Sequence, residues 1–147
     1  MEKNNPIKKA LPMKDAFRVL SFIFAAIMIS ACSKKVTFPV SDVVPAAEAV
    51  VKVEKDDNKN FEIDLEVSNL ASPDRLTPAR RHYVVWMVTR KHGTINIGNL
   101  DINRKNNGEL NTSTAYEPIR IFITAEDDSK PVLPSTQVVL NSGDFEV

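Results

Sequence analysis

The chain has a single cysteine, Cys32, and this thiol is the group whose chemistry the sequence defines best. It lies directly after an uncharged run from Val19 to Ala31, which follows a basic segment with five lysine and arginine residues. A helix that crosses a bilayer needs roughly 20 apolar residues, so this run is short for a permanent span and typical of a signal-peptide core. A lone thiol behind such a core is expected to be modified rather than paired in a disulfide.

The residues around this thiol resemble the processing box of bacterial lipoproteins. Ile29 is a branched aliphatic residue, Ser30 and Ala31 are small, and Cys32 follows them. The resemblance implies that Cys32 receives diacylglycerol, that cleavage falls between Ala31 and Cys32, and that the freed amine takes a further acyl chain such as palmitate. Two or more acyl chains anchor a protein stably. We therefore expect residues 1–31 to form a cleaved signal-peptide helix. The alternatives are an uncleaved anchor and an ordinary signal peptide.

The resemblance also implies a location in the cell envelope. Ser33, Lys34 and Lys35 follow the cysteine. In some Gram-negative groups acidic residues at these positions signal surface export, whereas here the residues are basic. In enteric bacteria an Asp in the place of Ser33 is associated with inner-membrane retention, and this Asp is absent. We therefore expect a lipid-anchored protein of the outer membrane that faces the periplasm. Exposure at the cell surface and anchoring in the inner membrane are the alternatives.

The charge of the mature chain argues against nucleic-acid binding. Residues 1–31 hold five of the 19 basic and two of the 19 acidic residues, so the mature part keeps 14 basic and 17 acidic residues and a net charge of −3. Neutralising phosphates requires clustered lysine and arginine, and no basic stripe interleaved with aromatic residues occurs.

Residue types that perform catalysis or bind metals are few and scattered. His82 and His92 lie at opposite ends of one predicted strand and so cannot share a metal ion. The HExxH, CxxC and GxSxG motifs do not occur, and a lipidated Cys32 leaves no thiol nucleophile. The acidic segments 56–58 and 126–128 lack the spacing of a calcium loop and are expected to be solvated turns. The sequence therefore predicts a non-enzymatic protein with no metal and no cofactor apart from the lipid on Cys32.

A long polar loop at residues 69–81 holds the candidate binding residues. Arg75, Arg80 and Arg81 cluster there, with His82 beside them. Such side chains can bind phosphates, acidic sugars or the carboxylates of a partner. The alternative is a solvated loop surface. Loops on a rigid β-sandwich often carry function, so we expect any binding site to lie here.

The elements that must position this loop are predicted to be β-strands. Apolar residues alternate with polar ones over 47–55 and 61–68, with a polar turn between them, which indicates a hairpin. A short helix over 46–55 is the alternative, although the β-branched valines there argue against it. Further strands are predicted at 82–90, 94–102, 119–125 and 137–140. About seven short strands with turns between them predict an all-β, single antiparallel Ig-like β-sandwich.

The predicted domain organisation follows from these strands. Residues 1–31 are the signal peptide, residues 32–46 a lipidated tether leading into an edge segment, and residues 47–147 the sandwich. Asn106-Asn107-Gly108 is typical of a tight hairpin turn. Trp86, in the middle of the most apolar strand, is expected to fill the core between the sheets. The other predicted core residues are Val84, Val88, Ile121 and Ile123.

Residues 80–141 resemble the extracytoplasmic domain of anti-sigma-K factors. The motifs are Tyr83-Val84-Val85-Trp86, Ile97-Gly98-Asn99-Leu100, the strand 121–126, and a proline-rich approach to 137–140. The resemblance implies the fold and an extracytoplasmic setting. Those factors also have a cytoplasmic zinc-binding segment and a membrane-spanning helix, which this sequence lacks, so the resemblance does not extend to inhibition of a sigma factor.

Together these patterns predict a lipid-anchored, non-enzymatic module of the envelope. It is expected to be held at the membrane by its lipid and to bind another envelope protein or serve a structural role. The alternative is an extracytoplasmic sensory or regulatory component related to anti-sigma factors. A third possibility is an accessory lipoprotein that binds carbohydrate or calcium.

Overall fold

The computed structural model describes residues 33–147. The predicted signal peptide, the cleavage site at Ala31 and the lipidated Cys32 lie outside this range. Residues 33–147 form eight β-strands and one short 3-10 helix, η1 (Pro73–Arg75), with no α-helix. Within this part of the chain no helix is long and apolar enough to cross a membrane. The predicted all-β class is confirmed.

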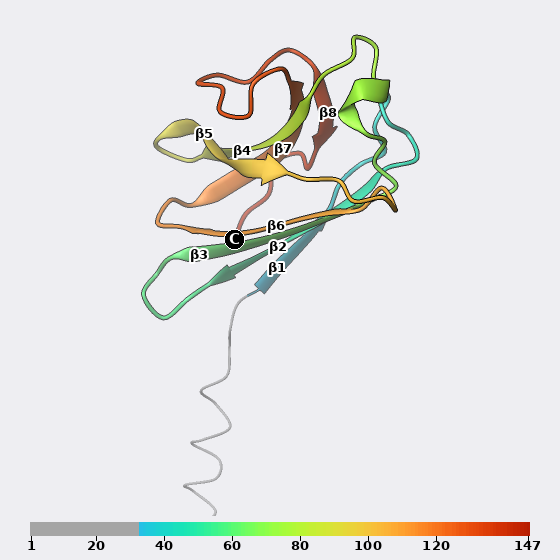
Figure 1. The fold of residues 1–147 in the computed structure, drawn as a ribbon. Coiled ribbons are helices and arrows are strands. Elements are labelled where there is room, and N and C mark those ends of the chain that lie inside the picture. The colour runs from blue at the N-terminus through green and yellow to red at the C-terminus, as the bar shows by residue number, and fades with distance from the viewer. Residues whose placement is uncertain (1–32) are drawn as a thin grey trace, which may run out of the picture. The chain divides into compact units, whose positions relative to one another are not determined.

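The strands form two antiparallel four-stranded sheets (Figure 1). The first sheet has the order β1-β2-β3-β6, formed by Ser33–Thr37, Glu48–Lys55, Phe61–Ser68 and Gly108–Thr114. The second sheet has the order β5-β4-β7-β8, formed by Gly93–Leu100, His82–Thr89, Pro118–Glu126 and Val138–Asn141.

The connections between the sheets give the sandwich its topology. The chain crosses to the second sheet after β3, returns for β6, and crosses again for β7, so β6 pairs with β3 and β7 pairs with β4. This is the connectivity of an Ig-like sandwich, and β1 adds one further edge strand to it. The predicted antiparallel sandwich of about seven strands is therefore confirmed.

The first hairpin shows how the sequence pattern sets the fold. Along β3 the burial alternates, with Phe61, Ile63 and Leu65 buried and their neighbours exposed. Successive side chains of a strand point to opposite faces, so this alternation places one apolar face against the core. The turn before β3 is closed by a hydrogen bond from the Lys59 amide to the carbonyl of Asp56. Residues 48–55 form β2, so the helical alternative for this segment is wrong.

The segment predicted as a tether is part of the sandwich over its described residues. β1 pairs with β2, and Val36 lies opposite Val51. Beyond β1, Phe38, Val44 and Ala47 are buried in the core. The prolines of residues 33–46 interrupt the alternation of apolar and polar residues, so the sequence pattern does not indicate a strand there. The edge of β2 offers unpaired backbone groups, and β1 pairs with them.

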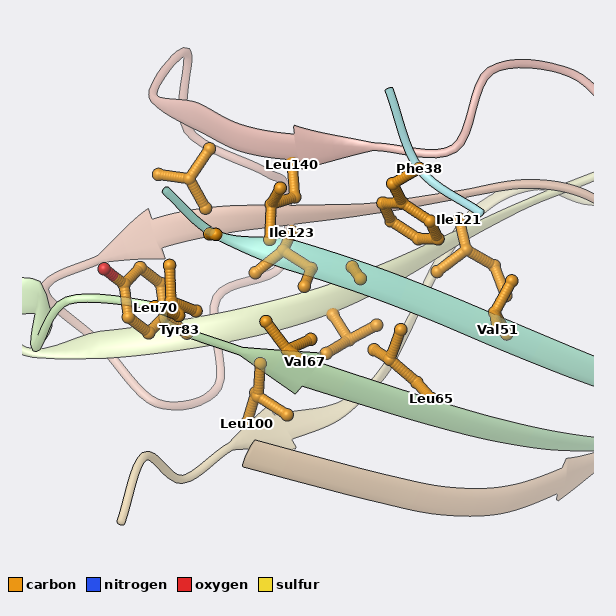
Figure 2. Packing of buried hydrophobic residues seen from close by; sticks show 14 of the residues in the cluster. Phe38, Val51, Leu65, Val67, Leu70, Tyr83, Leu100, Ile121, Ile123 and Leu140 are labelled. Atoms are coloured by element: carbon orange, nitrogen blue, oxygen red, sulfur yellow. The ribbon is translucent and has the colours of Figure 1, made fainter. Parts of the chain in front are cut away.

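The core lies between the two sheets and draws on all eight strands or their flanks (Figure 2). Ile121 and Ile123 of β7 are fully buried there, as the sequence predicts. Tyr83, Val85 and Met87 of the neighbouring strand β4 lie beside them on the same inner face of the second sheet. Burial of these side chains is the main stabilising contribution to the fold.

Trp86 is buried, but it lies on the outer face of the second sheet rather than between the sheets. Because Tyr83, Val85 and Met87 point into the core, the alternation of β4 turns Val84, Trp86 and Val88 to the opposite face. Trp86 stacks there on Phe122 of β7, with ring centroids 6.4 Å apart. The prediction that Trp86 fills the core between the sheets is therefore wrong. Val84, predicted as a core residue, is fully buried, but on this outer face. Val88 is only half-buried.

The turn at Asn106 connects the two sheets instead of closing a hairpin. β5 pairs with β4, and β6 pairs with β3, so the strands on either side of the turn are not hydrogen-bonded neighbours. Asn106 takes a positive φ of 61°. A Cβ atom at Gly108 would lie 2.9 Å from Cδ1 of Ile102 and 3.0 Å from the backbone oxygen of Asp101, so a side chain there would require its neighbours to shift.

Candidate functional site

The two ends of the sandwich differ in the length of their connections (Figure 1). The long-loop end, as we define it, carries residues 38–47, 69–81, 101–107 and 127–137. The short-turn end carries residues 56–60, 90–92 and 115–117. β1 begins at the short-turn end, because Ser33 lies opposite Glu54 near the end of β2. The candidate binding residues all belong to the long-loop end.

A cleft of about 410 Å³ opens at the long-loop end. Its lining comes from three stretches of chain, residues 72–74, 80–83 and 99–102. It brings Arg80, Arg81 and His82 together, as the sequence predicts, but not Arg75, which is exposed on η1 and does not line the cleft. Asp74 and Asp101 line the same cleft, so its charge is mixed rather than strongly basic.

Tyr83 forms part of the lining and is fixed by its hydroxyl group. That hydroxyl donates a hydrogen bond of 2.8 Å to the carbonyl oxygen of Ala71. Burial of the side chain, with a further contribution from Asp74, raises the pKa of Tyr83 to about 12. The phenol therefore stays neutral at physiological pH and serves to hold the 69–81 loop against β4.

Arg80 is engaged within the protein and is not free to bind an external anion. Its Nε donates a hydrogen bond of 2.9 Å to Oε1 of Gln137, and its Nη1 forms an ion pair with Asp127. Gln137 in turn donates from Nε2 to the carbonyl of Pro78, at 3.0 Å. Arg80 thus joins the 69–81 loop to both ends of the 127–137 loop. The cation that remains exposed at the cleft is Arg81.

A second set of hydrogen bonds holds the 127–137 loop to the outer face of the second sheet. Trp86 donates from Nε1 to Oγ1 of Thr124 at 2.8 Å, and that hydroxyl donates to Oε1 of Glu126. The amide of Ser135 also donates to Oε1 of Glu126, at 2.8 Å. Buried polar groups are stable when they are paired in this way. The loop is therefore fixed at its base from two directions.

The tip of the 127–137 loop presents apolar side chains to solvent. Val132 is 91% exposed and Leu133 is 77% exposed, and Pro131 and Pro134 flank them. The prolines restrict the backbone on both sides of the pair. The sequence motif Pro-Val-Leu-Pro is the signal that would have located this feature, and reasoning from charged residues alone missed it.

The two histidines lie far apart, and the acidic turn at residues 56–58 has a structural role. His82 and His92 lie at opposite ends of the sandwich, near the long-loop end and in a turn of the short-turn end. Asp56 accepts a hydrogen bond of 2.7 Å from the amide of Asn60, which closes its turn. Within residues 33–147 no three histidine or acidic side chains gather in a way that would hold a metal ion.

The sequence and the structure match no family model, no curated protein and no solved structure. The resemblances to bacterial lipoproteins and to anti-sigma-K factors therefore remain predictions from the sequence.

Proposed function

We propose that this protein is a lipid-anchored, non-enzymatic module of the cell envelope that binds another envelope protein through its long-loop end. The lipid on Cys32 would hold it at the membrane, most simply at the periplasmic face of the outer membrane. The observation that carries the binding half of the proposal is the exposed pair Val132 and Leu133 on a loop fixed at its base.

The fixed base favours binding over a merely solvated loop. An apolar pair exposed to water is unfavourable for an isolated domain, whereas an apolar anchor that enters a partner's pocket contributes strongly to binding. Holding the loop in one conformation lowers the entropic cost of association. The cleft beside Arg81 lies at the same end and could receive an acidic side chain of the same partner.

The binding proposal is tested by crosslinking in intact cells. A photoreactive phenylalanine analogue replaces Leu133 in the full-length chain, and the matched control carries it in place of Ser113, which is exposed on the first sheet. We expect one defined adduct when the analogue is at position 133 and the same adduct when it replaces Val132. No adduct is expected from position 113. The adduct should weaken in an Arg80→Ala background, where the loop base is released. Equal adducts from positions 133 and 113 would contradict the proposal.

A further inference from the structure

The short-turn end of the sandwich carries a second cleft, of about 290 Å³, which we call the basic cleft. The turns after β2, β4 and β6 meet there. Its lining includes one carboxylate and five basic side chains, namely Glu117 and Lys55, Lys59, Arg90, Lys91 and His92.

The positive charge of this lining is only partly balanced by ion pairs within the domain. Arg90 donates from Nε to Glu117 at 3.1 Å, and this pair accounts for the one carboxylate of the lining. Across residues 33–147 no ion pair forms with Lys55, Lys59 or Lys91. Asp56 and Asp57 lie in the same turn as Lys59 but do not line the cleft, and the carboxylate of Asp56 accepts a hydrogen bond from the amide of Asn60.

Two aromatic side chains complete the basic cleft. Nζ of Lys55 lies 5.2 Å from the centroid of the Phe61 ring, and the ring of His92 packs on that of Tyr116, with centroids 4.4 Å apart. Tyr116 is 42% exposed. A tyrosine with an apolar ring and a polar hydroxyl suits the boundary between lipid headgroups and acyl chains.

The chain enters the domain at this same end. Ser33, the residue after Cys32, lies opposite Glu54, one residue before Lys55. An acyl group on Cys32 would thus keep the basic cleft within a few residues of the membrane surface. Lys34 in β1 is exposed and lies opposite Val53, two residues before Lys55, so it adds positive charge to this end of the first sheet.

The outer face of the first sheet carries the opposite charge, which restricts how the domain can lie on a membrane. Its outward-facing carboxylates are Glu48, Glu54, Glu62, Asp64, Glu66 and Glu109. The cations among them are Lys35 and Lys52. The hydrogen bond that Lys52 donates to Glu54, the charge of Glu54, and the charges of Asp64 and Glu62 raise the pKa of Lys52. An anionic surface would repel this face and attract the short-turn end.

From these contacts we infer that the basic cleft binds the phosphate groups of anionic phospholipids and stands the sandwich upright on its membrane. The long-loop end then points away from the lipid surface, toward a partner. This inference rests on the proposed anchoring for the nearness of the membrane, but the cleft's affinity for anionic lipid does not need the anchor.

The test uses residues 33–147, without the leader and without Cys32, because the two sheets form a compact unit with its own core. Co-sedimentation is measured with vesicles of phosphatidylcholine alone and of phosphatidylcholine mixed with phosphatidylglycerol. The variant Lys59→Asn/Lys91→Gln removes two cations of the basic cleft. The matched control, Arg104→Gln/Lys105→Gln, removes two exposed cations at the long-loop end.

We expect binding only to the vesicles that contain phosphatidylglycerol. Each cation near an anionic surface contributes about fivefold in affinity, so the cleft variant should lose roughly 25-fold. The control pair should leave binding unchanged. Equal losses in the two variants, or equal sedimentation with both kinds of vesicle, would overturn the inference.

Free phosphate is distinguished from lipid by a second arm of the experiment. If inorganic phosphate shifts the amide resonances of residues 90–92 and 115–117 while vesicles do not bind, the source is a soluble anion and the membrane inference fails. Because this domain lacks Cys32, failure here leaves the lipidation proposal intact. Loss of lipid labelling in the full chain would remove the anchor without changing the vesicle result.

Discussion

Arg80 shows how one side chain can organise the candidate binding surface without contacting a ligand. It comes from the longest connection of the described chain and bonds to Asp127 and Gln137, which bracket the next longest. The charge that suggested a binding role is used to fix the geometry of the neighbouring loop. At this position the role of a cation is to hold Val132 and Leu133 in place.

Replacing Arg80 with alanine should release the 127–137 loop while the sandwich stays folded. The lost ion pair and hydrogen bond are half-buried, so we expect a modest loss of about 1 kcal/mol in the free energy of unfolding. Hydrogen exchange should accelerate at the amides of Ser135 and Gln137 and stay unchanged in β3. Arg104→Ala serves as the control. Unaltered exchange in the loop would contradict the role assigned to Arg80.

Tyr83 predicts how stability depends on pH at the alkaline end. Its pKa rises from 10.0 in the unfolded chain to about 12 in the folded one, chiefly through burial. A group whose folded pKa is raised contributes its full stability below the unfolded value and loses it as pH rises through the folded value. Stability should therefore fall between pH 10.0 and about 12.

The measurement is a chemical unfolding series over that pH range for the wild type and Tyr83→Phe. The variant should lose stability at neutral pH, because the carbonyl of Ala71 loses its donor. It should also lack the part of the alkaline decline that Tyr83 causes. Parallel curves for the two proteins would show that Tyr83 does not carry this dependence.

At the scale of elements, β4 is buried on both faces. The sequence could therefore predict that β4 is a strand but not which of its faces points into the core. In β3 polar residues mark the outer face, so the pattern gave both the strand and its orientation. In β4 the run from Tyr83 to Met87 is apolar throughout. The strand was predictable, but nothing local distinguishes its two faces. The side on which Trp86 lies depends on contacts with Phe122 and Thr124, which are distant in sequence.

The candidate site was predictable to a similar extent. Arg80, Arg81 and His82 meet at one cleft because they adjoin the start of β4. The partners of Arg80 could not be read from the sequence, since they depend on how β7 and β8 are placed beside β4. The basic cleft was missed for the same reason, because its cations come from the end of β2 and from the turns after β2 and β4, which only the packing of the two sheets brings together.

The network on the outer face of β4 and β7 gives a prediction at this scale. Thr124→Val keeps the shape of the side chain but leaves Nε1 of Trp86 without its acceptor and removes a donor to Glu126. Leaving buried polar groups unpaired should cost about 1–3 kcal/mol in the free energy of unfolding. Thr94→Val, an exposed change on the same face, is the control. Urea unfolding that shows equal stability for the two variants would rule out a stabilising network.

For the whole molecule, the two ends of the sandwich suggest a division of roles. The short-turn end receives the chain from Cys32 and carries the basic cleft, while the long-loop end carries the fixed loop and its exposed apolar pair. A rigid sandwich between them would hold the binding loops at a set distance from the membrane. This arrangement depends on one covalent event, the acylation of Cys32.

Metabolic labelling with palmitate tests that event most directly. The full-length wild type and the Cys32→Ala variant are expressed in the same bacterial host and recovered from membranes. We predict that the wild type incorporates labelled palmitate and is processed to the mature size, whereas the variant takes up no label and keeps its leader. Equal incorporation of label by the two proteins would contradict the lipid anchor and, with it, the orientation and function proposed for the molecule.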